Sequence, residues 1–244
     1  MDSILYDSKN EQTYRFGLHI LEYVPRNMKQ SIIDLGSGSG ALTKELTFYG
    51  GYVIGIDKNL NTVMKATAKY PMVPFYMMDA CRLQYENRFD VAFSNAMIQE
   101  VEDKKKLMSS VYNCLKSGGR FIAEFASSVA NSEYFELLDA ELKSKGLGNT
   151  AKKYHLINKE ECIELLTEAG FRIEIIDENL RSTYVRGDDD NVREFVKSTI
   201  NRSVDRAVRE RIVDRLMDVC RDKFKTPRGW VKDVARIRFL AIKD

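Results

Sequence analysis

The sequence predicts an α/β protein built on an open, doubly wound and mostly parallel sheet. Two observations lead to this prediction. Apolar runs of strand length alternate with helical segments over residues 30–126, and glycine turns separate several of them. Residues 31–57 read as strand, glycine turn, helix and strand, which is a βαβ unit with parallel strands.

The elements can be placed in order from these patterns. Residues 1–30 predict a helical lead-in that Pro25 ends. The strands are expected over residues 31–35, 52–56, 73–78, 89–93 and 120–125. The helices between them are expected over residues 41–46, 59–69 and 102–116.

The pattern changes after residue 126. A helix is expected over 133–144, and Asn158 with Glu161 predicts a capping box for another helix that ends near Gly170. Residues 171–178 and 234–243 alternate as strands, and residues 180–230 between them are mostly charged and helical. We expect a single domain over 1–244, with a core at 30–126 and a helical insertion at 180–230 before the last strand.

Composition bounds the function. The 244 residues contain 38 Lys and Arg against 36 Asp and Glu, which argues against disorder and gives no simple case for a nucleic-acid or membrane-surface protein. The four cysteines are dispersed, so we expect no metal site and interpret them as reduced thiols of a cytoplasmic protein. Neither a secretion signal nor a membrane span is expected. The charge is unevenly distributed along the sequence, because the part from residue 181 onward contains 17 Lys and Arg but 11 Asp and Glu.

The glycine turn between the first two strands is the strongest motif. Gly36, Gly38 and Gly40 allow a tight turn into a helix, whose N-terminus offers free N–H groups. Asp57 ends the next strand, where a carboxylate can accept both hydroxyls of a ribose. Together they predict a site for a nucleoside-containing cofactor. The alternative is that the glycines serve only the turn and Asp57 only caps a helix.

The identity of that nucleoside is a separate question. Gly36, Gly38 and Ala41 also match the loose dinucleotide fingerprint, so a nicotinamide oxidoreductase is one alternative. Gly40 and the two acids Asp34 and Asp79 disagree with it.

Several motifs in the right order resemble the class I S-adenosylmethionine-dependent methyltransferases. They are Ile33 to Gly40, Asp57, Met78-Asp79-Ala80, Phe89 to Ala96 and Leu115 to Gly119. The resemblance implies a seven-stranded Rossmann-like sheet with an antiparallel last strand, with S-adenosylmethionine as cofactor and S-adenosylhomocysteine as product. It also implies the cofactor-binding residues, namely Asp34, Gly36, Ser37, Gly38, Gly40, Asp57, Lys58, Asp79, Ala80, Asn95 and Ala96.

Residues 94–101 are similar to a subgroup that methylates small carboxylic acids, although this chain has Glu100 where that subgroup often has an aromatic residue. We therefore expect in-line methyl transfer to a small molecule, for which a carboxylate is one candidate. An ionised carboxylate needs no general base, and no catalytic base is identified. An RNA or protein methyltransferase and a non-catalytic cofactor-binding protein are the alternatives. The acceptor atom and the oligomeric state stay open.

Most of the substrate-binding residues are expected in two segments outside the cofactor-binding core. The N-terminal segment and the insertion are predicted to form a substrate lid, in which an arginine could hold an anionic acceptor. The alternative for each arginine is a solvated surface charge. The expected partner is a small molecule, with neither a membrane nor a nucleic acid. The candidate substrate residues are Tyr6, Tyr14, Arg15, Gln99, Arg181, Tyr184 and Arg186.

Overall fold

The computed structural model describes residues 14–129, 132–148, 155–185, 189–201, 203–227 and 229–244. The chain divides into two compact units. The first contains residues 1–127, 155–178 and 236–244, and the second contains 128–154 and 179–235. The chain therefore enters the second unit twice, and each unit is described by itself below.

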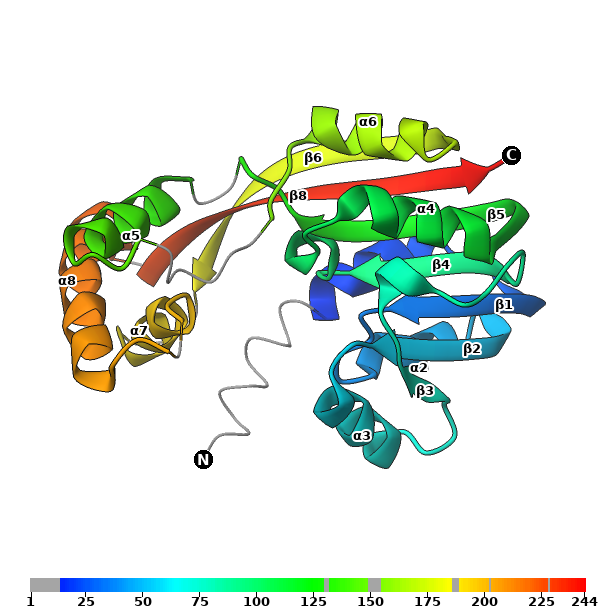
Figure 1. The fold of residues 1–244 in the computed structure, drawn as a ribbon, viewed down its shortest axis with the longest axis horizontal. Helices are drawn as coiled ribbons and strands as arrows, with labels where there is room; N and C mark the ends of the chain where they lie inside the picture. The colour runs from blue at the N-terminus through cyan, green and yellow to red at the C-terminus, as the bar shows by residue number, and fades with distance from the viewer. Residues whose placement is uncertain (1–13, 130–131, 149–154, 186–188, 202, 228) are drawn as a thin grey trace. The chain divides into compact units, whose positions relative to one another are not determined.

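The first unit is built on a sheet with the strand order β3-β2-β1-β4-β5-β8-β6. The pairs β1–β2, β1–β4, β2–β3 and β4–β5 are parallel, whereas β8 is antiparallel to β5. This confirms the predicted seven-stranded, mostly parallel sheet with an antiparallel last strand (Figure 1). The strands are β1 (Asn27–Leu35), β2 (Gly50–Asp57), β3 (Phe75–Met77), β4 (Phe89–Asn95), β5 (Leu115–Ala126), β6 (Phe171–Val185) and β8 (Gly229–Lys243).

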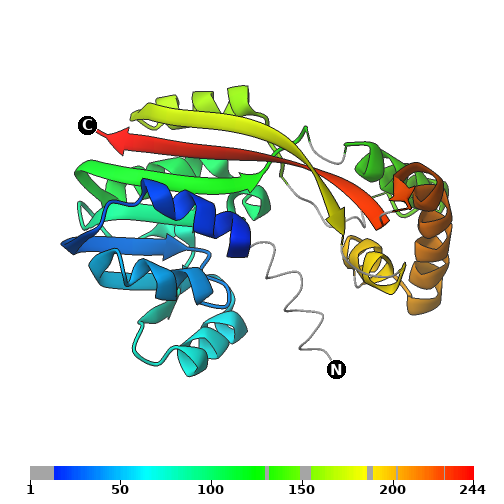
Figure 2. The same cartoon turned by 180° about the vertical axis from the view of Figure 1, so that it is seen from behind.

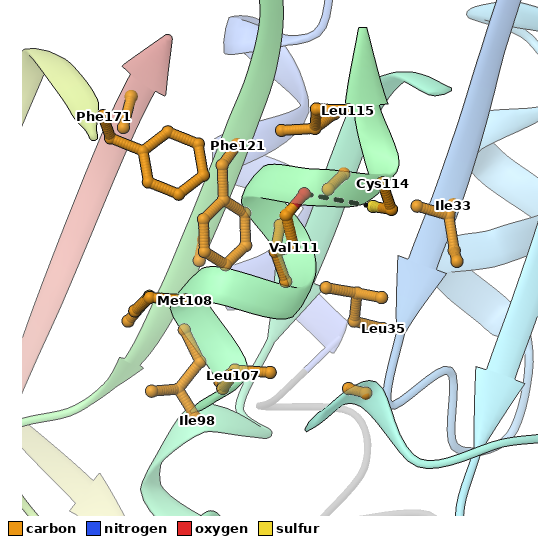
Figure 3. Close-up of a cluster of buried hydrophobic side chains, with 14 of the residues drawn as sticks. Ile33, Leu35, Ile98, Leu107, Met108, Val111, Cys114, Leu115, Phe121 and Phe171 are labelled. Atoms are coloured by element: carbon orange, nitrogen blue, oxygen red, sulfur yellow. Dashed lines mark hydrogen bonds between the residues drawn. The ribbon is translucent and has the colours of Figure 1, made fainter. Parts of the chain in front are cut away.

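Helices cover both faces of this sheet, as a doubly wound fold requires. On one face, α4 (Lys104–Cys114) and α6 (Lys159–Glu168) pack against the strands. Figure 3 shows this core, in which Val111 of α4 lies among Leu35, Phe121 and Phe171. The predicted capping box of α6 is confirmed, because Asn158 and Glu161 exchange hydrogen bonds between side chain and backbone.

The opposite face is covered by the N-terminal helix, described over residues 14–20, together with η1 (Leu21–Tyr23) and α2 (Ala41–Leu46) (Figure 2). Ile32 and Phe93 are buried on this face, whereas Ile33 lies on the other. Successive residues of a strand point to opposite faces, so strands covered on both sides read as continuous apolar runs. The remaining elements of the unit are α3 (Leu60–Lys69), η2 (Ala80–Arg82) and η3 (Ile98–Glu100).

The second unit has its own hydrophobic core. It contains α5 (Ser132–Ser144), α7 (Asp189–Ser198), α8 (Arg206–Phe224) and the short β7 (Lys225–Thr226), which pairs with the start of β8. Asp189 accepts hydrogen bonds from Trp230 Nε1 at 3.0 Å and from Lys225 Nζ at 2.7 Å. The buried core residues are Tyr134, Leu138, Leu142, Val192, Val196, Ile200, Val204, Ile212, Val213, Leu216, Met217, Cys220 and Trp230.

Two features of this unit differ from the expectation. β6 and β8 extend to Val185 and from Gly229, beyond the predicted 171–178 and 234–243, because the apolar alternation marks only the part of a strand that lies over a core. The unit also includes α5, which the sequence does not group with residues 180–230. The assignment of 1–244 as one domain stays a prediction. Among the described helices, none is long and apolar enough to cross a membrane.

Candidate functional site

The glycine turn joins the carboxyl end of β1 to the start of α2. Gly36, Gly38 and Gly40 have φ angles of +73°, +53° and +79°, a region that L side chains disfavour. Two of them are also required by close packing. A Cβ at Gly36 would lie 2.5 Å from Met97 Cγ, and one at Gly40 would lie 2.6 Å from Phe75 Cζ.

Gly38 differs from these two glycines because the space in front of it is open. Among the described atoms, a Cβ at this position would approach nothing closer than the Gly36 carbonyl oxygen, at 3.9 Å. The neighbouring Ser37 hydroxyl is buried without a hydrogen-bond partner in the described part of the chain. A buried hydroxyl without a partner is costly, so the turn has both room and hydrogen-bonding capacity for a ligand or for water.

Two carboxylates end the strands beside this turn. At the end of β2, Asp57 accepts hydrogen bonds from Gly38 N at 3.2 Å and from Asn59 N at 2.9 Å. In the next strand, Met77 pairs with Asp57, and Asp79 follows two residues later. Asp79 accepts from Cys81 N at 2.9 Å and begins η2, in which Ala80 is buried. The structure therefore brings the acids, Ala80 and the turn to one edge of the sheet.

The carboxyl end of β4 lies at the same edge. Asn95 is buried, and Ala96 follows with a φ of +59°, which turns the chain sharply. Ala96 N donates to the Glu124 carbonyl at 2.7 Å. Gln99 Nε2 donates to the Ala96 carbonyl at 2.7 Å, and Gln99 Oε1 accepts from Ala126 N at 3.4 Å. Gln99 is thus fixed between the ends of β4 and β5.

Asp34 is a buried acid at the end of β1. Only 2% of the residue is exposed, and Thr43 Oγ1 donates to Asp34 Oδ2 at 2.6 Å. Burial raises the pKa of this carboxyl to about 7, the Thr43 hydrogen bond opposes that shift, and the nearby charge of Asp57 adds to it.

This buried acid makes stability depend on pH. The pKa of Asp34 is raised from 3.8 to about 7 on folding, so the folded state binds more protons over that interval. We therefore expect the free energy of unfolding to fall as the pH rises through the interval, by up to roughly 1.4 kcal/mol for each unit of pKa shift. Asp34→Asn keeps an acceptor for Thr43 and should flatten this dependence. Urea unfolding of both proteins at about pH 5 and about pH 8 measures it, and equal pH slopes would contradict it.

The predicted substrate residues are dispersed. Tyr14 and Arg15 lie on the N-terminal helix, where the Tyr14 hydroxyl donates to Glu45 Oε1 at 3.3 Å and Arg15 is exposed. Arg181 and Tyr184 lie in the part of β6 that belongs to the second unit. Tyr6 and Arg186 fall outside the described residues. The structure thus gathers the predicted cofactor residues at one edge of the first unit, and the described Gln99 lies beside Ala96 there.

Comparisons with known proteins show which proteins this chain is similar to. A family model described as "Methyltransferase domain" matches residues 33–123, which include the glycine turn, Asp57, Asp79 and Asn95. An uncharacterized methyltransferase of Schizosaccharomyces pombe is 26% identical over 245 residues, covering 92% of this chain and 91% of that protein. The chain is a methyltransferase.

Solved structures agree with the fold of this methyltransferase. The YcgJ protein from Bacillus subtilis is 18% identical and superposes with a TM-score of 0.69, covering 93% of this chain and 97% of that one. Phosphoethanolamine N-methyltransferase 2 of Haemonchus contortus, in complex with S-adenosylmethionine, is 23% identical with a TM-score of 0.59. That match covers 94% of this chain but 52% of the other.

One group beside the site is absent from the sequence prediction. Glu124 of β5 and Arg236 and Arg238 of β8 form a charged cluster next to Asn95. An acid inside the apolar run of β5 and two arginines at alternate positions of β8 are visible in the sequence. Their meeting depends on the pairing of strands that lie more than 100 residues apart, and no local pattern predicts that pairing.

Proposed function

We propose that this methyltransferase binds S-adenosylmethionine at the glycine turn and transfers its methyl group to a small-molecule acceptor. The observation that carries the proposal is the open space at Gly38, with the carboxylate of Asp57 beside it. Met97 and Phe75 occupy the space in front of the other two glycines of the turn. The open space therefore lies at Gly38, where a ligand would meet backbone N–H groups.

The residues at this edge would divide the binding between them. Asp57 would accept from the ribose hydroxyls, and Asp79 with Ala80 would meet the adenine edge. The cofactor would approach the backbone of the glycine turn at Gly36, Ser37, Gly38 and Gly40. The remaining members of the proposed site are Asp34, Lys58, Asn95 and Ala96.

When bound, the cofactor supplies a methyl group that the positive charge of its sulfur already activates. The protein then has to align the acceptor in line with that methyl group and exclude water, and alignment of this kind can supply about 7–11 kcal/mol. We assign no general base. An acceptor that is already deprotonated at neutral pH needs none, which is why a carboxylate is the favoured candidate.

Two observations support a small acceptor. The Haemonchus contortus neighbour carries the name of an enzyme that acts on phosphoethanolamine, a small molecule. Tyr14, Arg15 and Gln99 lie in the first unit and offer groups that suit a polar or anionic acceptor. The other candidate substrate residues, Tyr6, Arg181, Tyr184 and Arg186, stay predictions. Free thiols at all four cysteines support a cytoplasmic location.

The acceptor class can be tested by following the methyl group. The enzyme is incubated with S-adenosylmethionine labelled on the methyl group and a cell extract that is separated into small-molecule, RNA and protein fractions. We expect label in the small-molecule fraction, in amounts that vary little with salt. Label in RNA that falls steeply as salt rises would contradict the proposal. So would label in protein, or the absence of S-adenosylhomocysteine with every fraction.

A further inference from the structure

The charged cluster beside Asn95 lies on one face of the sheet. Glu124 pairs in register with Arg238 across β5 and β8, and with Asn95 across β4 and β5. Arg236 is two residues before Arg238, so its side chain leaves the same face. The Glu124 side chain is 3% exposed, and those of the two arginines are 12% and 13% exposed. At this burial the Glu124 carboxylate attracts the two guanidinium groups more strongly than it would in water.

Arg236 connects three elements of the first unit. Its Nε donates to Glu124 Oε1 at 2.6 Å, and its Nη2 donates to Asn95 Oδ1 at 3.3 Å and to the Glu124 carbonyl at 3.4 Å. Its guanidinium carbon lies 4.7 Å from the centre of the Phe16 ring on the N-terminal helix. A planar guanidinium can donate hydrogen bonds to a carboxylate and an amide while its face lies against a ring, which a lysine ammonium cannot do.

Arg238 shares the same carboxylate but reaches a different segment. Its Nη2 lies 2.9 Å from Glu124 Oε2, and its Nη1 lies 3.7 Å from Glu22 Oε1 of η1. Its guanidinium carbon lies 6.0 Å from the centre of the Tyr23 ring. The two arginines therefore contact different segments, since Arg236 contacts Asn95 and the N-terminal helix, whereas Arg238 contacts η1.

The N-terminal helix lies directly on Asn95. A Cβ at Gly17 would lie 2.8 Å from Asn95 Nδ2 and 2.3 Å from Leu42 Cδ1, so only a glycine fits between them. The oxygen of the Asn95 amide is held by Arg236, which leaves its NH₂ group on the helix side. The orientation of Asn95 thus depends on Arg236 and on the seat of the helix together.

We infer that Arg236 is a positioning residue for methyl transfer, because it fixes the Asn95 side chain and the N-terminal helix at the carboxyl end of β4. The inference rests on the proposed function, which places Asn95 in the wall of the cofactor site. Glu124 holds Arg236 in turn. In this role Arg236 acts through Asn95 and the helix, without touching the cofactor or the acceptor.

The test compares two variants that each leave one arginine on Glu124. Arg236→Met should raise the Kd for S-adenosylmethionine in calorimetry and lower kcat/KM, each by roughly 10- to 100-fold, because a displaced wall misaligns the site. Arg238→Met breaks an ion pair to the same carboxylate and should change both quantities less than about 3-fold. Hydrogen exchange of residues 14–20 should accelerate only in Arg236→Met. Equal effects of the two variants on Kd would overturn the inference and leave a purely structural cluster.

A double-variant cycle shows whether Arg236 acts through Asn95. Asn95→Ala and Arg236→Met should each weaken S-adenosylmethionine binding, and the double variant should be no worse than the more severe single variant. Multiplied effects would mean that Arg236 acts by another route, which also overturns the inference. Arg236→Lys should recover stability but only part of the affinity. If the wild-type enzyme itself fails to bind S-adenosylmethionine, the proposed function has failed instead.

Discussion

Gly38→Val is expected to abolish S-adenosylmethionine binding while the sheet stays folded. The valine side chain would enter the space that no described protein atom occupies within 3.9 Å, where the cofactor is proposed to approach the backbone. The φ of +53° adds strain, since a branched side chain is disfavoured in this region. Calorimetry with the cofactor, together with circular dichroism of the variant, measures both effects.

Gly118→Val is the matched control for this strain. Gly118 has a φ of +74° and, among the described atoms, nothing within 4 Å of an added Cβ, but it lies near the amino end of β5. Each valine should cost about 1–2 kcal/mol of stability through its left-handed backbone. Only Gly38→Val should lose the cofactor. Full occupancy in that variant would mean that the cofactor binds elsewhere.

Asp57→Ala should weaken S-adenosylmethionine binding by roughly 1–3 kcal/mol, the cost of leaving buried donors without their acceptor. In the protein alone, this carboxylate already accepts from Gly38 N and Asn59 N, so it ties the glycine turn to the start of α3. Its loss would therefore affect both the ribose contact and the shape of the turn. Titration calorimetry at constant ionic strength gives the change in affinity directly.

Asp90→Ala separates this effect from a general loss of carboxylates. Asp90 accepts from Ser31 N and from Lys116 Nζ, each at 2.7 Å, near the amino ends of the strands. This variant should lose stability in urea unfolding and keep its cofactor affinity. If Asp57→Ala, with its fold intact, bound the cofactor as tightly as the wild type, the placement of the ribose would be wrong.

The parts of the fold that depend on local chemistry could be predicted from the sequence. The Asn158 and Glu161 capping box needs only residues three positions apart, and the glycine turn needs only a strand, a helix and the left-handed backbone between them. Strands that are covered on both faces are apolar along their whole length, so their positions also follow from the local sequence. Asp57 could be placed at the end of β2 because an apolar run stops there.

The parts that depend on distant pairing could not be predicted in this way. The outer portions of β6 and β8 lie in the second unit, outside the core that produces the apolar alternation. Arg236 looks like a solvated surface charge until β8 is placed beside β5, which puts it over Glu124. The placement of α5 in the second unit likewise depends on contacts with α8, which begins more than 60 residues after α5 ends.

The position of β8 between β5 and β6 has a consequence for how the protein is made. In the described sheet, β6 joins the other strands only through β8, although β6 comes earlier in the chain. During synthesis, β1 to β5 can pair as soon as they emerge, whereas β6 must wait until the second unit and the final strand have followed. One edge of β5 is therefore left unpaired until β8 has been made, and it is open to pairing with other chains during this interval.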